Sequence, residues 1–170
     1  KLSSGEKLNE IKLAYETYGK LNNEKTNAIL VCHAISGDSH VARHDKQDLP
    51  GWWDIMVGPG KSIDTDKYFV ICSNVIGGCS GSTGPNSINI KTGKEFGSSF
   101  PVVTIEDMVS AQKLLIDYFG IKKLLCVTGG SMGGFQSMQW SIQFPEKVES
   151  IIPIATSPRL TNQALAFDIV

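Results

Sequence analysis

The stretch that decides the fold is Thr128-Gly129-Gly130-Ser131-Met132-Gly133-Gly134. An apolar run, 123–127, precedes it, and a helix-like run closed by Pro145 follows it. A strand, a tight Gly-X-Ser-X-Gly turn and a helix together form a nucleophile elbow, in which the turn lifts the serine hydroxyl above the edge of a sheet. Only small neighbours fit so tight a turn. The sequence therefore predicts that Ser131 is an acyl-accepting nucleophile.

Length and composition fit one globular domain. The 170 residues are 41% hydrophobic and carry a net charge of −1, so neither nucleic acid nor an anionic membrane is an indicated partner. No apolar run approaches the ~20 residues that span a bilayer. The first residues lack the apolar segment of a signal peptide. We expect a cytoplasmic protein.

The four cysteines are Cys32, Cys72, Cys79 and Cys126. Three of them lie in apolar runs and are expected to be small core residues with reduced thiols. Their spacings fit no zinc-binding pattern, so we expect no metal.

Four runs have the length of strands, and the continuous apolar run 28–32 is typical of a strand buried on both faces, as in a parallel sheet. These runs are 28–32, 68–72, 123–127 and 148–155. The alternating stretch 11–18 predicts one further, half-exposed strand. Strands separated by helices or loops indicate an α/β fold. In such sheets, sites form at the carboxyl ends of the strands.

The segments between these strands include one clear helix. It begins at Thr104, which forms a capping box with Asp107, and Gly120 is well placed to end it. Residues 51–58 are expected to form a short helix. Residues 74–101 form a long irregular stretch whose spaced apolar residues favour a packed loop over a linker.

Acyl transfer passes through an oxyanion, which needs two aimed hydrogen-bond donors. One donor should be the N–H of Met132, directly after the nucleophile. The second should come from the loop 33–37, which follows the strand 28–32. The N–H of Ile35 is our candidate, and that of Ala34 is its rival.

Two phosphate-binding alternatives fit less well. The Ser131 turn lacks the G-x-G-x-x-G pattern and the lysine of a P-loop. The stretch Gly58-Pro59-Gly60-Lys61-Ser62 resembles the end of a Walker A motif, but the first required glycine falls at Ile55. A surface turn is the better interpretation.

No histidine of this sequence stands where the elbow architecture needs its base. His33, His40 and His44 all precede Ser131, whereas the acid and the base follow the serine in this architecture. We expect His33 to shape the oxyanion loop, and His40 and His44 to lie near the mouth of the site. A serine without its base is a weak nucleophile. We therefore expect the chain to be a fragment of a longer protein.

Four stretches together carry a resemblance to a known family. They are His33-Ala34-Ile35-Ser36-Gly37-Asp38-Ser39-His40, Gly77-Gly78-Cys79-Ser80-Gly81-Ser82-Thr83-Gly84-Pro85, Phe100-Pro101-Val102-Val103-Thr104-Ile105-Glu106-Asp107-Met108 and Gly129-Gly130-Ser131-Met132-Gly133-Gly134. In these stretches the sequence resembles the homoserine O-acetyltransferases, acyltransferases of methionine biosynthesis. One departure is Ile35, where the family commonly has leucine. A backbone donor is indifferent to that change.

The resemblance implies an α/β-hydrolase fold, a mostly parallel sheet with flanking helices, which is incomplete in this chain. Residues 1–159 would form the N-terminal part of the core domain, and residues 160–170 the start of the segment leading to a helical lid. The implied reaction has two steps. Ser131 takes an acetyl group from acetyl-CoA, and L-homoserine then receives it. No permanently bound cofactor is implied, and the family is typically homodimeric.

Other readings stay open at this point. Close relatives of the family use succinyl-CoA as donor or L-serine as acceptor. A plain serine esterase would pass the acyl group to water instead. A hydrolase-fold module without activity also fits a chain that lacks a base. Of these, acetyl transfer to L-homoserine is the function that the resemblance favours.

Overall fold

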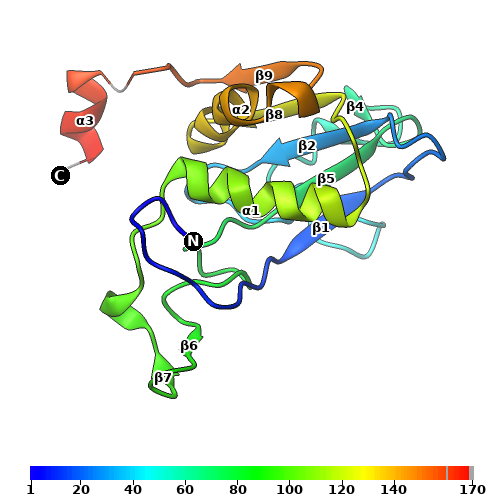
Figure 1. Cartoon of the computed structure of the whole chain (residues 1–170). Helices are drawn as coiled ribbons and strands as arrows, with labels where there is room; N and C mark the ends of the chain where they lie inside the picture. Colours follow the sequence, from blue (N-terminus) through cyan, green and yellow to red (C-terminus); the bar gives the residue numbers. More distant parts are fainter. Residues whose placement is uncertain (160, 169–170) are drawn as a thin grey trace.

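A five-stranded sheet forms the centre of the computed structural model, which describes residues 1–159 and 161–168 (Figure 1). The strand order is β1-β5-β2-β8-β9. The bounds are β1 Tyr15–Tyr18, β2 Ala28–Cys32, β5 Phe69–Ser73, β8 Cys126–Gly130 and β9 Ile151–Ile154. β1 pairs antiparallel with β5, and the other pairs are parallel. The predicted mostly parallel sheet is thus confirmed.

The central strands β2 and β5 of the sheet are buried along their whole length. All five residues of β2 are buried, as expected for the continuous apolar run Ala28–Cys32. In the register of the sheet, Leu30 pairs with Ile71 on one side and with Val127 on the other. Of the four cysteines, all free, only Cys79 is exposed. The prediction that the other three are core residues is confirmed.

One face of the sheet is covered by α1 (Ile105–Tyr118) and α2 (Met132–Gln143), which pack on each other (Figure 1). Thr104 caps α1 through the predicted capping box with Asp107. Gly120, with φ of 68°, follows the end of this helix. Both helix signals that the sequence carried are therefore confirmed.

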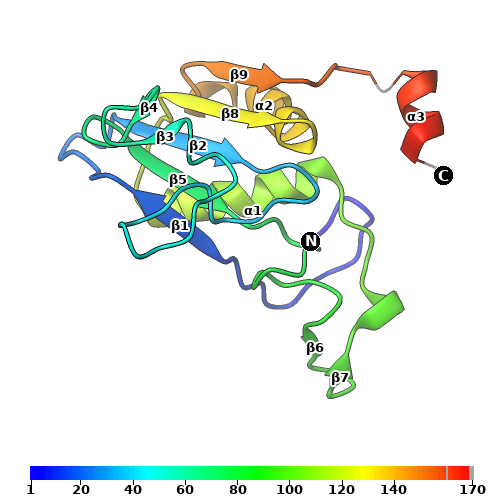
Figure 2. The same cartoon turned by 180° about the vertical axis from the view of Figure 1, so that it is seen from behind.

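The opposite face is covered by the segment 39–68 rather than by helices (Figure 2). This segment holds two short paired strands, β3 (Val57–Gly58) and β4 (Ile63–Asp64). The helix predicted over residues 51–58 is wrong, because this stretch folds as turns that lead into β3. The surface turn predicted at 58–62 is confirmed; it connects β3 to β4.

The long stretch 74–101 is a packed loop, as predicted. It contains the hairpin of β6 (Ile88–Asn89) and β7 (Lys94–Glu95) and the short helix η1 (Gly97–Ser99). Its base is fixed by the buried Ser82, whose hydroxyl donates to the carbonyl of Asn74 (2.6 Å) and accepts from the N–H of Ala14 (2.9 Å). In Figure 1 the hairpin projects away from the sheet.

The chain after α2 contains η2 (Pro145–Lys147), β9 and then α3 (Asn162–Asp168). Figures 1 and 2 both draw α3 apart from the sheet and its two covering helices. Residues 160, 169 and 170 of the segment predicted to lead to a lid lie outside the described residues. No helix in the described part of the chain is long and apolar enough to cross a membrane.

Candidate active site

Ser131 sits in the turn between β8 and α2. Its backbone has φ of 54° and ψ of −118°, a conformation that non-glycine residues rarely adopt. The turn is held in place because the Ser131 N–H donates to the carbonyl of Ile154 on β9 (3.0 Å). The side chain is exposed. This strained, exposed serine at a strand-to-helix turn has the geometry of the predicted elbow.

The glycines around Ser131 allow the start of α2 to touch the end of β2. A Cβ atom at Gly133 or at Gly129 would overlap the carbonyl oxygen of Cys32. A Cβ at Gly134 would overlap the side chain of Thr156. The glycines are therefore needed for close approach, and they bring the loop that follows β2 against the elbow.

That loop folds into a tight turn, in which the N–H of Gly37 donates to the carbonyl of Ala34 (2.9 Å). Ile35 occupies the first central position of the turn. Within residues 1–159 and 161–168, neither the N–H of Ile35 nor that of Met132 donates a hydrogen bond. The same holds for the N–H of Ala34, the rival donor. The geometry thus leaves all three predicted N–H groups available to a ligand.

His33 ties the same loop to the segment that follows β5. Its Nδ1 lies 2.7 Å from the carbonyl oxygen of Ala34, and its Nε2 lies 3.1 Å from the backbone nitrogen of Val75. The first contact requires a protonated Nδ1 and the second an unprotonated Nε2, so the ring is neutral. Burial lowers its pKa below the ordinary value of 6.5. Both ring nitrogens are occupied, which fits the predicted loop-shaping role and leaves none for a base.

Gln136 supports the candidate site, and the sequence analysis missed it. Its Nε2 lies 3.3 Å from the carbonyl oxygens of both His33 and Met132, so one amide joins the two segments that carry the predicted donors. Gln112 of α1 donates to the Oε1 of Gln136 (2.7 Å), and Trp140 donates to Gln112 (2.8 Å). All three side chains are fully buried. The only sequence signal was the four-residue spacing of Gln136 and Trp140 along one helix.

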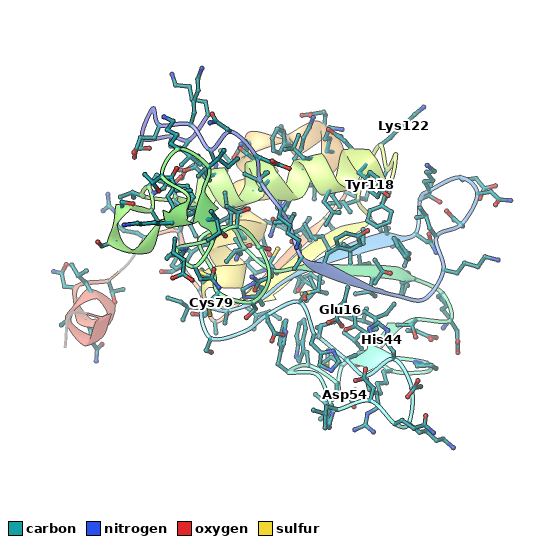
Figure 3. The ribbon with its side chains drawn as sticks, turned by 90° about the horizontal axis from the view of Figure 1, so that it is seen from below. Glu16, His44, Asp54, Cys79, Tyr118 and Lys122 are labelled. Atoms are coloured by element: carbon teal, nitrogen blue, oxygen red, sulfur yellow. The ribbon has the colours of Figure 1, made fainter. Side chains whose placement is uncertain are left out.

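His40 and His44 lie beside Glu16 of β1, and Figure 3 shows Glu16 and His44 next to each other. In the described part of the chain neither ring forms a hydrogen bond with Ser131. Their predicted position near the mouth of the site stays a prediction.

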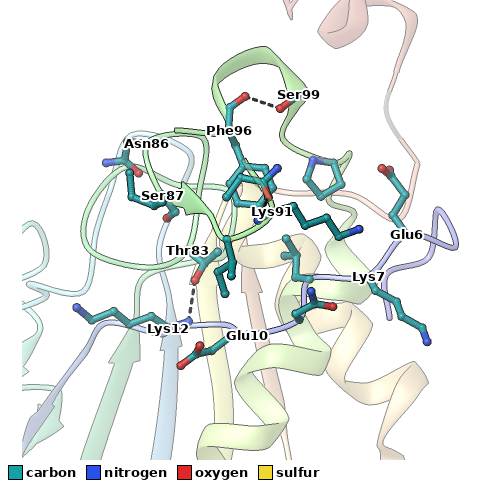
Figure 4. Close-up of a pocket in the computed structure, with 16 residues that line it drawn as sticks. Glu6, Lys7, Glu10, Lys12, Thr83, Asn86, Ser87, Lys91, Phe96 and Ser99 are labelled. Carbon is teal, nitrogen blue, oxygen red and sulfur yellow. Dashed lines mark hydrogen bonds between the residues drawn. The ribbon is translucent and has the colours of Figure 1, made fainter. Parts of the chain in front are cut away.

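A cavity of about 620 Å³ lies between the N-terminal segment 6–12 and the loop 83–101 (Figure 4). Lysines and glutamates both line it, and the N–H of Lys12 donates to Thr83 across one wall. Ser131 is not among its lining residues. This cavity is therefore separate from the predicted acyl site.

Comparison with known families gives one match that covers most of the chain. The model of the alpha/beta hydrolase fold family matches residues 27–169. This span includes the sheet strands β2, β5, β8 and β9 and both covering helices.

Among the curated relatives named homoserine O-acetyltransferase are two of high identity. One, from Methanohalobium evestigatum, is 62% identical over 99% of this chain and 35% of its own length. The other, from Deferribacter desulfuricans, is 60% identical over 98% of this chain and 45% of its own length. The resemblance inferred from the sequence is thereby confirmed. The chain spans between a third and a half of the length of these relatives.

The solved structures that are similar to the chain include two with the same identity. The homoserine O-acetyltransferase from Bacillus anthracis is 42% identical, with a TM-score of 0.86 over 89% of this chain and 43% of that one. Esterase E22 is also 42% identical, with a TM-score of 0.86 over 98% of this chain and 48% of that one. The fold, the elbow and the family match agree: this chain belongs to the α/β-hydrolase fold family.

Proposed function

We propose that this chain is part of a homoserine O-acetyltransferase that transfers an acetyl group from acetyl-CoA to the hydroxyl of L-homoserine. The observation that carries the proposal is the strained, exposed Ser131 in a chain 60–62% identical to relatives of that name. O-Acetyl-L-homoserine is then the product, and methionine biosynthesis the pathway.

In the first step the Oγ of Ser131 gives its proton to a general base and attacks the thioester carbonyl of acetyl-CoA. The carbonyl oxygen becomes an oxyanion, which accepts hydrogen bonds from the N–H groups of Met132 and Ile35. The C–S bond breaks, and CoA leaves as a thiol once it receives a proton. In the second step the hydroxyl of L-homoserine attacks the acetyl-enzyme, loses its proton, and releases Ser131.

Both steps need a group that moves a proton at the Oγ of Ser131. His33 does not qualify, because backbone groups occupy both of its ring nitrogens. In the elbow architecture the acid and the base follow the serine along the chain. We therefore place the base in a part of the full-length protein that follows Ser131. We also propose a homodimer and a cytoplasmic location, by analogy with the family.

The second candidate function is ester hydrolysis. Esterase E22 matches this chain with the same identity and TM-score as the acetyltransferase from Bacillus anthracis. In both functions an acyl group is transferred to Ser131. They differ only in whether water or L-homoserine accepts it.

A steady-state assay of the full-length protein separates these functions. We expect CoA release from acetyl-CoA to depend on L-homoserine and to exceed release from succinyl-CoA. We expect L-serine to replace L-homoserine poorly. Rapid hydrolysis of a simple acetyl ester, with no stimulation of CoA release by L-homoserine, would support the esterase instead. Ser131→Ala is the control that removes either activity.

A further inference from the structure

Three potential metal ligands meet on the side of the sheet that the segment 39–68 covers. The Oε2 of Glu16 lies 2.9 Å from the Nδ1 of His40 and 3.1 Å from the Nε2 of His44. All three ligand atoms lie within 4.8 Å of one another. Figure 3 shows Glu16 and His44 facing each other there. Each side chain is between 26% and 47% exposed, so a solvent ion can reach the group.

The contact between His40 and Glu16 is not an ordinary hydrogen bond between a neutral imidazole and a carboxylate. Its Nε2 lies 2.9 Å from the carbonyl oxygen of Leu49, which can only accept, so Nε2 carries a hydrogen. In a neutral ring Nδ1 then presents a lone pair to the carboxylate of Glu16. Such a contact needs a cation between the two atoms, either a second proton on the ring or a metal ion. Metal-ligating histidines usually donate their other N–H to a carbonyl or carboxylate in this way.

The remaining two ligands are also held in place by neighbours. Tyr18 donates its hydroxyl to the Oε2 of Glu16 (2.6 Å) and accepts from the N–H of Ala42 (3.3 Å). The ring of Tyr18 stacks on that of His44, with 4.5 Å between the centroids. Tyr18 is only 5% exposed, so this support is rigid. Ligands fixed by such contacts bind metal with a smaller loss of side-chain entropy.

We propose that Glu16, His40 and His44 bind a divalent transition-metal ion of the Zn²⁺ class, with water as a further ligand. Zn–N and Zn–O bonds of about 2.0–2.1 Å place tetrahedral ligand atoms roughly 3.3 Å apart, within a few tenths of an ångström of the two contacts found here. Two imidazoles exclude Mg²⁺ and Ca²⁺, which take oxygen ligands. The expectation of no metal considered cysteine spacings alone. Glu16 lies 24 and 28 residues before the two histidines in the chain.

The proposed ion would fasten the edge strand β1 to the loop that follows β2. We assign it a structural role, because none of its ligands is among the groups predicted to act on the acyl group. The proposal is therefore independent of the proposed function. The competing state is a metal-free cluster in which His40 carries two protons and pairs with Glu16.

The test is metal binding by tag-free, full-length protein that has been dialysed against chelator. Titration with Zn²⁺ in a calorimeter should show one ion per chain at micromolar affinity or tighter. Titration with Co²⁺ should produce the visible absorption band of a tetrahedral complex. Zn²⁺ should also raise the unfolding temperature. If Zn²⁺ produced no heat of binding and Co²⁺ produced no absorption band, the proposal would be overturned in favour of the protonated cluster.

Variants locate the ion. Glu16→Gln and the more exposed His44→Gln should each weaken Zn²⁺ binding about tenfold or more. His44→Gln serves if Glu16→Gln fails to fold, since Tyr18 relies on Glu16. Asp45→Asn, in the same loop but outside the cluster, should bind Zn²⁺ as the wild type does. Undiminished binding by a folded His44→Gln variant would overturn the assignment.

Discussion

The backbone conformation of Ser131 carries most of the functional argument at the scale of a residue. A serine with φ of 54° and ψ of −118° is strained, and such strain costs about 1–3 kcal/mol. Proteins keep strain of this kind where the surrounding structure enforces it, which is common at catalytic residues. We therefore expect the backbone conformation of Ser131 to lower the stability of the fold while it keeps the serine hydroxyl exposed.

Replacing Ser131 by glycine should relieve this strain, because glycine tolerates positive φ. We expect Ser131→Gly to unfold with a free energy about 1 kcal/mol higher than Ser131→Ala, after the greater entropy of unfolded glycine is included. Both variants should lack acyl transfer. Denaturant unfolding of the full-length variants measures the difference. A glycine variant no more stable than the alanine variant would show that the elbow is unstrained.

His33 should contribute stability that depends on pH. The buried ring has a lowered pKa, so the unfolded chain takes up a proton near pH 6.5 while the folded ring stays neutral. Its contribution is fully present above that pH and is lost as the pH falls through the folded pKa. His33→Gln, which cannot titrate, should lose the ring's simultaneous hydrogen bonds to the carbonyl of Ala34 and the N–H of Val75, at a cost of about 1–3 kcal/mol.

Unfolding free energies between about pH 7.5 and pH 5 test this sign. The gap between wild type and His33→Gln should be widest at the upper end and should narrow toward the lower end. The charges of His40 and Glu16 are present in both proteins, so their effect cancels in the difference between the two unfolding free energies. A gap that widens on acidification would mean that His33 is charged in the folded state.

At the scale of elements, the contact between α2 and β2 places the loop 33–37 against the elbow. A Cβ at Gly133 would overlap the carbonyl oxygen of Cys32, whereas a Cβ at Gly130 would find its nearest neighbour 3.9 Å away. We expect Gly133→Ala to lose about 1–3 kcal/mol of stability through overpacking. Gly130→Ala, the matched control, should cost nothing. Thermal unfolding compares the two variants, and equal losses would refute this account of the contact.

The sheet elements could be predicted where side chains decide the structure. Continuous apolar runs located β2 within its observed bounds, and the capping box located α1. The strand predicted at 123–127 begins at Cys126 and runs on through Gly130 instead. Glycines in a sequence indicate a turn. Here Gly129 and Gly130 continue the strand. Glycine is needed at position 129 because a Cβ there would overlap the carbonyl oxygen of Cys32.

Other features depend on contacts between distant segments and could not be predicted. The apolar residues of 51–58 suggested a helix, but they pack on the second face of the sheet as turns, where Trp53 and Met56 join its core. In the sequence Gln136 is an ordinary polar residue of a helix, and only the packing of α1 and of the end of β2 around it buries its side chain. The cluster of Glu16 with two histidines likewise arises only when β1 meets the loop after β2.

At the scale of the whole molecule, an acyltransferase must keep water from its acyl-enzyme. We propose that the segment 77–85 of the loop 74–101 contributes to this exclusion. Its base is buried at Ser82, and its tip at 79–81 is exposed. Replacing the tip residues by a shorter glycine linker should raise hydrolysis of acetyl-CoA relative to transfer to L-homoserine. The same change in the exposed turn 91–93 of the β6–β7 hairpin is the control. An unchanged ratio of the two rates would remove the loop from this role.

The central claim, that Ser131 carries the acyl group, is tested most directly by mass spectrometry. Full-length protein would be mixed with acetyl-CoA without L-homoserine, quenched in acid, digested and mapped. We predict one added acetyl group on the peptide that contains Ser131, lost when L-homoserine is added before the quench and absent from Ser131→Ala. An unmodified Ser131 peptide, or an acetyl group that persists elsewhere in Ser131→Ala, would contradict the claim.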